Sequence, residues 1–247
     1  MSEPEIVVCG DATELYQRAA NQFVALANEA CRTTGQFTVA LSGGSTPRGL
    51  YSLLSMPQYR RQVLWSKVHF FWGDERCVAP DHPDSNYRMV EESLLASVDV
   101  DSENIHRMAG EKEPQTAARD YEERLKKSFS LSDGQFPRFD LVLLGLGEDG
   151  HTASLFAGVD ALDESKRMVV AVEFPLASRI TLTFPVFNGA ANVVFLVAGQ
   201  SKAAIVRDLL GGKSHAADLP AARVKLQNGR LVWLVTKDAA VELHDFS

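Results

Sequence analysis

The sequence predicts an α/β protein built on a doubly wound, mainly parallel, Rossmann-like sheet with helices on both faces. Three observations predict this class. Short apolar runs recur along the chain, amphipathic helical patterns separate them, and several runs end in glycine-rich or polar turns. Strands that alternate with helices favour parallel pairing, because each crossover helix returns the chain to the same edge of the sheet.

Eight short runs rich in β-branched or aromatic residues are predicted to be strands. They are residues 6–9, 37–41, 68–72, 141–146, 168–172, 180–184, 193–198 and 231–235. Several lack alternation of apolar and polar positions, which is typical of strands covered on both faces. Ligands of such sheets bind beyond the carboxyl ends of the strands, so the residues after each strand are the candidates for chemistry.

The clearest helix is predicted to begin after Asp11, which can cap it while Glu14 reaches back, and to end before Gly35. Its apolar stripe is Leu15, Ala19, Phe23, Leu26 and Ala30. Further helices are predicted to follow Pro47, Asn86, Pro114 and Gln200.

Composition predicts one globular domain over residues 1–247, since 45% of the residues are hydrophobic and 23% are charged. Lys and Arg number 25 against 32 Asp and Glu, which gives a formal net charge of −7. This balance argues against nucleic acid or an anionic membrane as a general partner, because both require a basic face. Any bound anion must therefore be held by a local group of donors.

The sequence also favours a cytoplasmic protein, either a monomer or a weak dimer. No apolar stretch approaches the roughly 20 residues that span a bilayer, and the first residues, MSEPEIVV, lack the charge and length of a secretory signal. Cys9, Cys31 and Cys77 are scattered and odd in number, which argues against a disulfide framework or a zinc site.

A candidate anion site follows the predicted strand at residues 37–41. Gly43 and Gly44 allow a tight turn that exposes backbone N–H groups, and Ser45 and Thr46 add hydroxyl donors before a helix. The spacing is not that of a Walker A loop and no lysine follows, so a monophosphate is favoured over a triphosphate. Taken alone, the segment fits a plain strand-to-helix turn equally well.

Charged residues lie at three further strand ends. Asp74 and Arg76 follow one strand, where the carboxylate is suited to orient sugar hydroxyls or handle a proton and the guanidinium to bind a phosphate. Arg179 directly precedes another strand. Lys202 opens a late helix, where it opposes the macrodipole unless an anion compensates. Each of these residues, taken singly, also fits an ordinary surface charge.

The sequence Gly-Glu-Asp-Gly-His after the strand at 141–146 is predicted to present His151 as a general base, with Asp149 two residues before it. The glycines of residues 145–150 formally spell the dinucleotide pattern GxGxxG. Glu148 and Asp149 disfavour that interpretation, because they place two like charges where a pyrophosphate must lie. The turn also fits a histidine that merely caps a following helix.

Four blocks, in this order, resemble the 6-phosphogluconolactonase family of the pentose phosphate pathway: LSGGSTP, FFWGDER with DHPDSNY, LGLGEDGHTASLF, and RITLTFPVFNGA with AGQSKA. The resemblance covers nearly the whole chain. It implies a fold shared with glucosamine-6-phosphate deaminase and hydrolysis of 6-phospho-D-glucono-1,5-lactone to 6-phosphogluconate, with no cofactor. By motif it implies that His151 and Asp74 stand at the lactone and that Asp149 supports the imidazole. The implied phosphate site is Gly43, Gly44, Ser45, Thr46, Arg76, Arg179 and Lys202.

In the implied mechanism His151 takes a proton from water, the water attacks the C1 carbonyl, and the proton returns to the ring oxygen. A deaminase is disfavoured, because no carboxylate follows His151 before Asp160 and because Arg76 stands where the deaminase pattern has tyrosine. The same residues also fit a non-catalytic sugar-phosphate-binding protein. The GxGxxG pattern, taken alone, would fit an NAD-dependent oxidoreductase. No two histidines have metal-ligand spacing, so no metal is expected.

Overall fold

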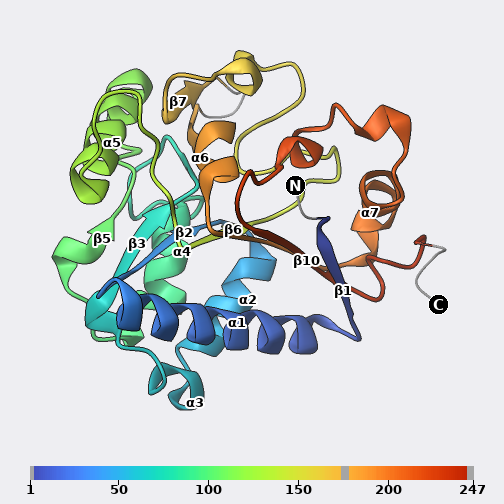
Figure 1. The fold of residues 1–247 in the computed structure, drawn as a ribbon, viewed down its shortest axis with the longest axis horizontal. Helices are drawn as coiled ribbons and strands as arrows, with labels where there is room; N and C mark the ends of the chain where they lie inside the picture. The colour runs from blue at the N-terminus through green and yellow to red at the C-terminus, as the bar shows by residue number, and fades with distance from the viewer. Residues whose placement is uncertain (1–2, 174–177, 244–247) are drawn as a thin grey trace.

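The computed structural model describes residues 3–173 and 178–243 and contains two sheets (Figure 1). The larger has seven strands, all parallel, in the order β1-β10-β9-β6-β2-β3-β5. These strands are β1 (Glu5–Cys9), β2 (Phe37–Leu41), β3 (Val68–Trp72), β5 (Ile105–His106), β6 (Leu141–Leu144), β9 (Asn192–Val197) and β10 (Arg230–Thr236). The predicted α/β class with a mainly parallel sheet is confirmed.

A second sheet of three antiparallel strands was not predicted. Its order is β4 (Asp74–Arg76), β8 (Arg179–Leu182) and β7 (Val169–Val172). The runs at 168–172 and 180–184 therefore form strands, but outside the parallel sheet. The chain changes sheets at Gly73, whose N–H donates to the carbonyl of Leu41 (2.8 Å) while its own carbonyl accepts from the N–H of Leu182 (2.8 Å).

The long first helix, α1 (Ala12–Thr33), is capped as predicted. Asp11 Oδ1 accepts from the N–H of Glu14 (2.8 Å), and Glu14 Oε2 accepts from the N–H of Gly10 (2.7 Å). Its predicted apolar stripe is buried, with only Leu26 partly exposed.

Six further helices follow α1 in the described part of the chain. They are α2 (Ser45–Leu54), α3 (Pro57–Arg60), α4 (Asn86–Ser93), α5 (Pro114–Phe129), α6 (Phe184–Gly189) and α7 (Ala203–Leu210). Short 3₁₀ turns lie at Trp65–Lys67, Leu95–Ser97, Ser102–Asn104, Asp160–Asp163, Gln200–Lys202, Ser214–Ala216 and Pro220–Arg223. Several boundaries differ from the prediction; the clearest are α2, which begins before Pro47, and Phe184, which was predicted to end a strand but begins α6. No helix in the described ranges has the length and apolar character needed to cross a bilayer.

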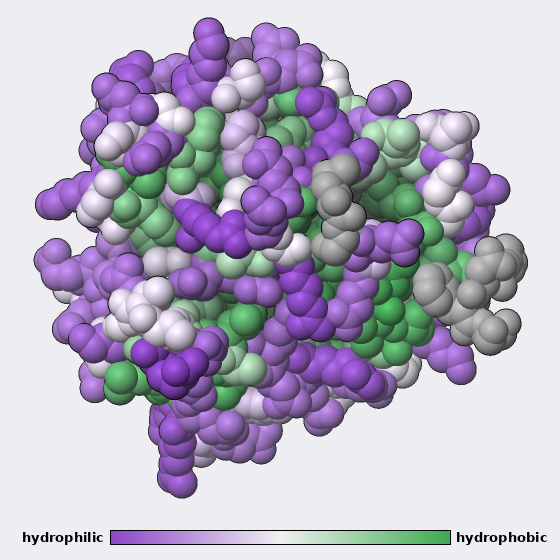
Figure 2. Space-filling view, viewed as in Figure 1, coloured by the Kyte–Doolittle hydropathy of each residue, from purple (hydrophilic) through white to green (hydrophobic). Residues whose placement is uncertain are grey.

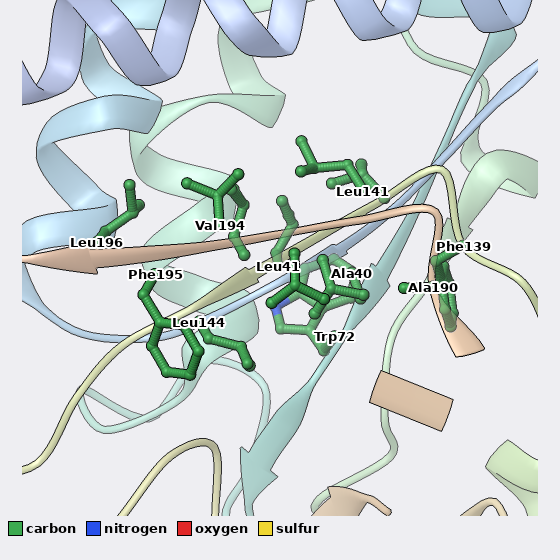
Figure 3. Packing of buried hydrophobic residues seen from close by; sticks show 14 of the residues in the cluster. Ala40, Leu41, Trp72, Phe139, Leu141, Leu144, Ala190, Val194, Phe195 and Leu196 are labelled. Carbon is green, nitrogen blue, oxygen red and sulfur yellow. The ribbon is translucent and has the colours of Figure 1, made fainter. Parts of the chain in front are cut away.

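The parallel sheet is covered on both faces. In Figure 1, α1 and α2 lie on one side of it, and α6 and α7 lie on the other. Its central strands are consequently buried along their length, as in β2, where all five residues are buried. Figure 3 shows side chains from neighbouring strands packed together, among them Leu41, Trp72, Leu144 and Phe195. Each such side chain contributes roughly 1.5–3 kcal/mol by leaving water.

Two buried tyrosines form hydrogen bonds with the backbone at the carboxyl ends of the neighbouring strands β2 and β3. The Tyr51 hydroxyl accepts from the N–H of Ser42 (3.0 Å) and donates to its carbonyl (2.9 Å). Tyr121 does the same at Trp72, with distances of 2.9 and 3.2 Å. Both strand ends are thereby held at the edge where the loops after β2 and β3 begin.

Most of the surface in Figure 2 is polar, but apolar residues gather in a recess on the side where α7 lies. A cavity of about 400 Å³ lies there, with walls from α7, the following turns and β10, including Leu226, Leu231 and Trp233. None of the predicted site residues lines this cavity.

Candidate active site

A cavity of about 250 Å³ lies at the carboxyl ends of the parallel strands, where loops after β2, β3, β6 and β9 meet. Every predicted site residue lines this cavity except Asp149, which is bonded to the imidazole of His151. The predicted residues in its wall are Gly43, Gly44, Ser45, Thr46, Asp74, Arg76, His151, Arg179 and Lys202.

The glycine-rich loop forms one wall and leads directly into α2. Gly44 is the N-cap residue and has φ +105°, a conformation that favours glycine. Because α2 begins at Ser45, the N–H groups of Ser45 and Thr46 belong to its first turn, which carries no acidic residue and lies beside the cavity. A β-carbon on Gly43 would come within 1.8 Å of Asn86 Oδ1, so a larger residue there would displace the buried Asn86 side chain. The first turn of α2 is suited to bind an anion.

Arg76 and Arg179 form a pair of like charges in the part of the cavity wall that the small sheet supplies. They are direct partners in the antiparallel β4–β8 register, and both are half-buried. Arg76 Nη1 donates to the carbonyl of Asp84 (2.5 Å), and the Arg179 guanidinium lies 5.4 Å from the ring centroid of Phe156. Burial and the charge of Arg76 lower the pKa of Arg179. Because like charges at opposite positions repel, this wall favours an anion between them.

His151 lies on a tight turn after β6. Its Nδ1 lies 2.5 Å from Asp149 Oδ1, and its ring centroid lies 4.3 Å from that of Phe156. Partial burial raises the pKa of Asp149, but the hydrogen bonds from His151 outweigh it and leave that pKa below its usual value. The turn is closed by Gly147, whose N–H donates to the carbonyl of His151 (2.9 Å).

The structure contradicts two of the interpretations of this turn. Residues 151–159, all within the described ranges, hold turns and a single bridge between Thr152 and Leu155, and the next helical residues are Asp160–Asp163. A dinucleotide motif requires a helix directly after its glycines, since the helix N-terminus binds the pyrophosphate. The GxGxxG interpretation is therefore wrong, and so is a helix-capping role for His151.

Asp74 is buried at the base of the cavity. Its Oδ2 accepts from Ser154 Oγ (2.6 Å), and Asn86 Nδ2 donates to its backbone carbonyl (2.9 Å) and lies 3.4 Å from Oδ1. The carboxylate is thus held by donors from two separate loops while it faces the cavity.

Lys202 enters the cavity from the other side, after β9. It closes the 3₁₀ turn Gln200–Lys202 and is the N-cap residue of α7, so it lies at the opening of the late helix as predicted. Its Nζ lies 3.8 Å from Glu148 Oε1. This ion pair places the lysine at the cavity mouth, on the side of the His151 turn.

Three residues in or beside the cavity wall had no role in the sequence prediction: Asn86, which lines the cavity, and Glu75 and Ser154, which are buried next to lining residues in the chain. Glu75 is buried and accepts from the N–H groups of Asn86 (2.7 Å) and Tyr87 (2.7 Å) at the start of α4. Burial raises the pKa of Glu75, while these backbone donors oppose the rise. Strand alternation would have placed Glu75 on the face opposite Asp74 and Arg76, but such a short polar strand has no recognisable pattern.

Within residues 3–173 and 178–243, no group of three or more His, Cys, Asp or Glu side chains is placed to hold a metal ion. The cavity instead combines a helix N-terminus, two arginines and a lysine with one histidine–aspartate pair.

The fold and this cavity define a class: α/β proteins with a pocket lined by cationic side chains and a helix N-terminus, beside a histidine paired with an aspartate. The family described as glucosamine-6-phosphate isomerases/6-phosphogluconolactonase matches residues 10–233. The chain belongs to this family, which confirms the resemblance seen in its motifs.

Individual relatives agree along nearly the full length. The chain is 40% identical to 6-phosphogluconolactonase of Synechocystis sp. over 241 residues, which cover 97% of this chain and 98% of the relative. It is 38% identical to the 6-phosphogluconolactonase of Nostoc sp. over 239 residues, covering 96% and 98%. Among solved structures, 6-phosphogluconolactonase from Trypanosoma cruzi aligns with a TM-score of 0.86 and 30% identity, covering 99% and 98%. A monomeric glucosamine-6-phosphate deaminase shares the fold, with a TM-score of 0.79 and 22% identity, covering 96% and 99%.

Proposed function

We propose that the chain hydrolyses 6-phospho-D-glucono-1,5-lactone to 6-phosphogluconate with His151 as general base. The observation that carries the proposal is the bond between His151 Nδ1 and Asp149, in a cavity whose other walls collect donors for a phosphate. Lactonases among the relatives of this chain support the same substrate.

The proposed reaction begins with the imidazole. Because Asp149 accepts the proton on Nδ1, the lone pair of Nε2 is available to take a proton from water. The water oxygen attacks C1 of the lactone, and the resulting imidazolium returns the proton to the ring oxygen as the C1–O bond breaks. Asp149 stabilises the imidazolium. General acid–base help of this kind is worth roughly 10²–10⁴-fold in rate.

The phosphate of the substrate is proposed to lie between the arginine pair and the first turn of α2. Arg76 and Arg179 supply forked donors, the N–H and hydroxyl groups of Ser45 and Thr46 face the same space, and Lys202 adds a third charge. Asp74 accepts from a hydroxyl of the sugar. With the phosphate fixed, C1 is held near the base, which supplies part of the rate as orientation.

The main rival activity is deamination of glucosamine 6-phosphate. No carboxylate follows His151 before Asp160, and the ring packs against Phe156 instead, while Arg76 lines the cavity. Both features favour the lactonase. The fold alone does not separate the two activities, because both occur on it.

Acid release from freshly prepared 6-phosphogluconolactone tests the proposal, with glucosamine 6-phosphate as the control substrate. We expect the wild-type protein to exceed the spontaneous rate and to release no ammonia from the amino sugar. His151→Ala should lose roughly 10²–10⁴-fold. A matched control is His215→Ala, since His215 also pairs with an aspartate, Asp208 (3.0 Å), but outside the cavity. Full activity in His151→Ala would contradict the proposal.

We further propose that this reaction takes place in the cytoplasm and that the protein acts as a monomer or weak dimer, with no nucleic-acid or membrane partner. The net charge of −7 supports the absence of such partners. Sedimentation at several protein concentrations tests the oligomeric state.

A further inference from the structure

Two cross-strand pairs of the small sheet lie beside the active-site cavity, and three of their four residues line it. Asp74 pairs with Thr181, and two residues further along Arg76 pairs with Arg179. Residues two apart on a strand share one face, so the two pairs lie side by side. The arginine pair lines the cavity, where it is proposed to bind the phosphate.

Ser154 contacts both members of the other pair. Its hydroxyl donates to Asp74 Oδ2 (2.6 Å), and its backbone N–H donates to Thr181 Oγ1 (3.4 Å). Ser154 and Thr181 are fully buried, and Asp74 is 5% exposed. The contact joins residues 80 positions apart in the chain, so it docks the turn that carries His151 onto the small sheet.

The backbone beside Ser154 is strained. Ala153 has φ +49°, a left-handed conformation that an L side chain rarely adopts. Its neighbour on the other side, Thr152, is also anchored, through a hydrogen bond from its hydroxyl to the carbonyl of Gly145 (2.9 Å). Strain of this kind persists only where the surroundings fix the chain on both sides.

We propose that Ser154 is a positioning residue that sets the distance between the His151 imidazole and the Arg76–Arg179 pair. With regard to the reaction, this inference rests on the proposed function. The arginines hold the substrate by its phosphate. C1 of that substrate reaches the His151 imidazole only if the turn that carries His151 is held in a fixed position on the small sheet. Small displacements are costly in such a geometry, because a misplacement of about 1 Å can lower the rate by about 100-fold.

The test compares Ser154→Ala and Ser154→Cys with wild type. The cysteine variant keeps the shape of the side chain with a larger sulfur atom, so it leaves no cavity, but it is a weak donor; it carries the test if the alanine variant does not fold. A matched control is Ser93→Ala, which removes a hydroxyl that bonds only within α4, to Met89. Three quantities are measured: kcat for 6-phosphogluconolactone, Kd for 6-phosphogluconate by calorimetry, and amide hydrogen exchange of residues 147–156.

We expect kcat to fall about tenfold or more in both Ser154 variants, with Kd within about threefold of wild type, because the phosphate site stays intact. Exchange of residues 147–156 should become faster, while α1 is unchanged. An unchanged kcat, or an equal loss of kcat and affinity, would overturn the positioning role. Unchanged exchange would overturn the docking itself. A wild-type protein without lactonase activity would refute the proposed function, whereas the exchange experiment would still decide the docking.

Discussion

Arg76 and Arg179 stand directly opposite each other on β4 and β8, so two guanidinium groups face one cavity from neighbouring strands. Like charges at opposite positions of an antiparallel pair destabilise the sheet. The chain is acidic overall, with a net charge of −7, so this local concentration of positive charge needs a specific explanation. The phosphate of the proposed substrate would supply one, because a dianion relieves the repulsion and can accept from both arginines.

Arg179→Met is therefore expected to weaken binding of 6-phosphogluconate by about 10–100-fold, the value of one or two hydrogen bonds to a charged group. Calorimetric titration measures this, and the rise in melting temperature on adding the ligand should shrink in parallel. Arg32→Met is the control, since Arg32 lies exposed on α1 and pairs with Glu29. Equal affinity in wild type and Arg179→Met would show that the phosphate lies elsewhere.

The main sheet could be predicted because its strands carry the composition of buried strands. Six of its seven strands match predicted runs, all but the two-residue β5, and the long helix α1 begins where its capping residues indicate. The small sheet is the clearest omission. Its strand β4 is three polar residues, Asp-Glu-Arg, which give no apolar pattern, and its partners β7 and β8 are fixed only by tertiary pairing. Strand propensity does not reveal which sheet a strand joins.

The predicted site residues were brought together because strand ends of a parallel sheet meet at one edge. What the sequence pattern missed are contacts between distant segments. Ser154 reaches Asp74 across 80 residues, and Glu75 caps α4 from a strand that was not predicted. Neither contact follows from periodicity or motif spacing, since both depend on how the small sheet packs against the turns.

Asp149→Asn is expected to lower kcat by about 10²–10⁴-fold with little change in affinity for 6-phosphogluconate. The amide can donate to Nδ1 instead of accepting from it, which favours the tautomer with the proton on Nε2 and removes the base. Steady-state kinetics and calorimetry on the same samples measure the two effects. Asp208→Asn, in the other histidine–aspartate pair, is the control. Unchanged kcat in Asp149→Asn would show that Asp149 does not orient the base.

Tyr51→Phe is expected to lower the free energy of unfolding by about 2–4 kcal/mol, because it leaves both the N–H and the carbonyl of buried Ser42 without their hydroxyl partner. Since Ser42 begins the glycine-rich loop, binding of 6-phosphogluconate should weaken as well. Urea unfolding measures the first effect. Tyr59→Phe removes a hydroxyl for which no hydrogen bond is seen among the described residues, so it should cost under about 0.5 kcal/mol. If both variants lost a similar free energy of unfolding, the two hydrogen bonds between Tyr51 and Ser42 would not be the cause.

Stability should fall in mild acid because of His106. Burial, together with the charges of His69 and Arg124, lowers the pKa of His106 to about 4, and its Nε2 lies 3.2 Å from Nδ1 of His69. The unfolded chain takes up this proton near pH 6.5, whereas the folded chain does so only near pH 4. Folding stability is therefore full above about pH 6.5 and declines as the pH falls towards 4.

Urea unfolding of wild type and His106→Phe, near pH 7.5 and near pH 5, measures this contribution. Phenylalanine keeps the stacking on Phe71, whose ring centroid is 4.2 Å away, and removes the titration. The wild type should lose on the order of 1–2 kcal/mol more than the variant between these two pH values. Parallel losses in the two proteins would assign the acid sensitivity to other groups.

Gly147→Ala is expected to lower kcat by about 100-fold or more while the protein stays folded. A β-carbon at this position would lie 2.0 Å from Nδ1 of His151 and 2.5 Å from Oδ1 of Asp149, so both side chains would have to shift. The displaced imidazole loses its orientation, and the rate falls with it. Gly189→Ala is the matched control, because its β-carbon would meet only the carbonyl of Pro137 at 3.7 Å, an ordinary contact. Kinetics and melting temperatures decide the outcome: if Gly147→Ala keeps wild-type kcat, the close approach of the turn to the pair has no part in catalysis.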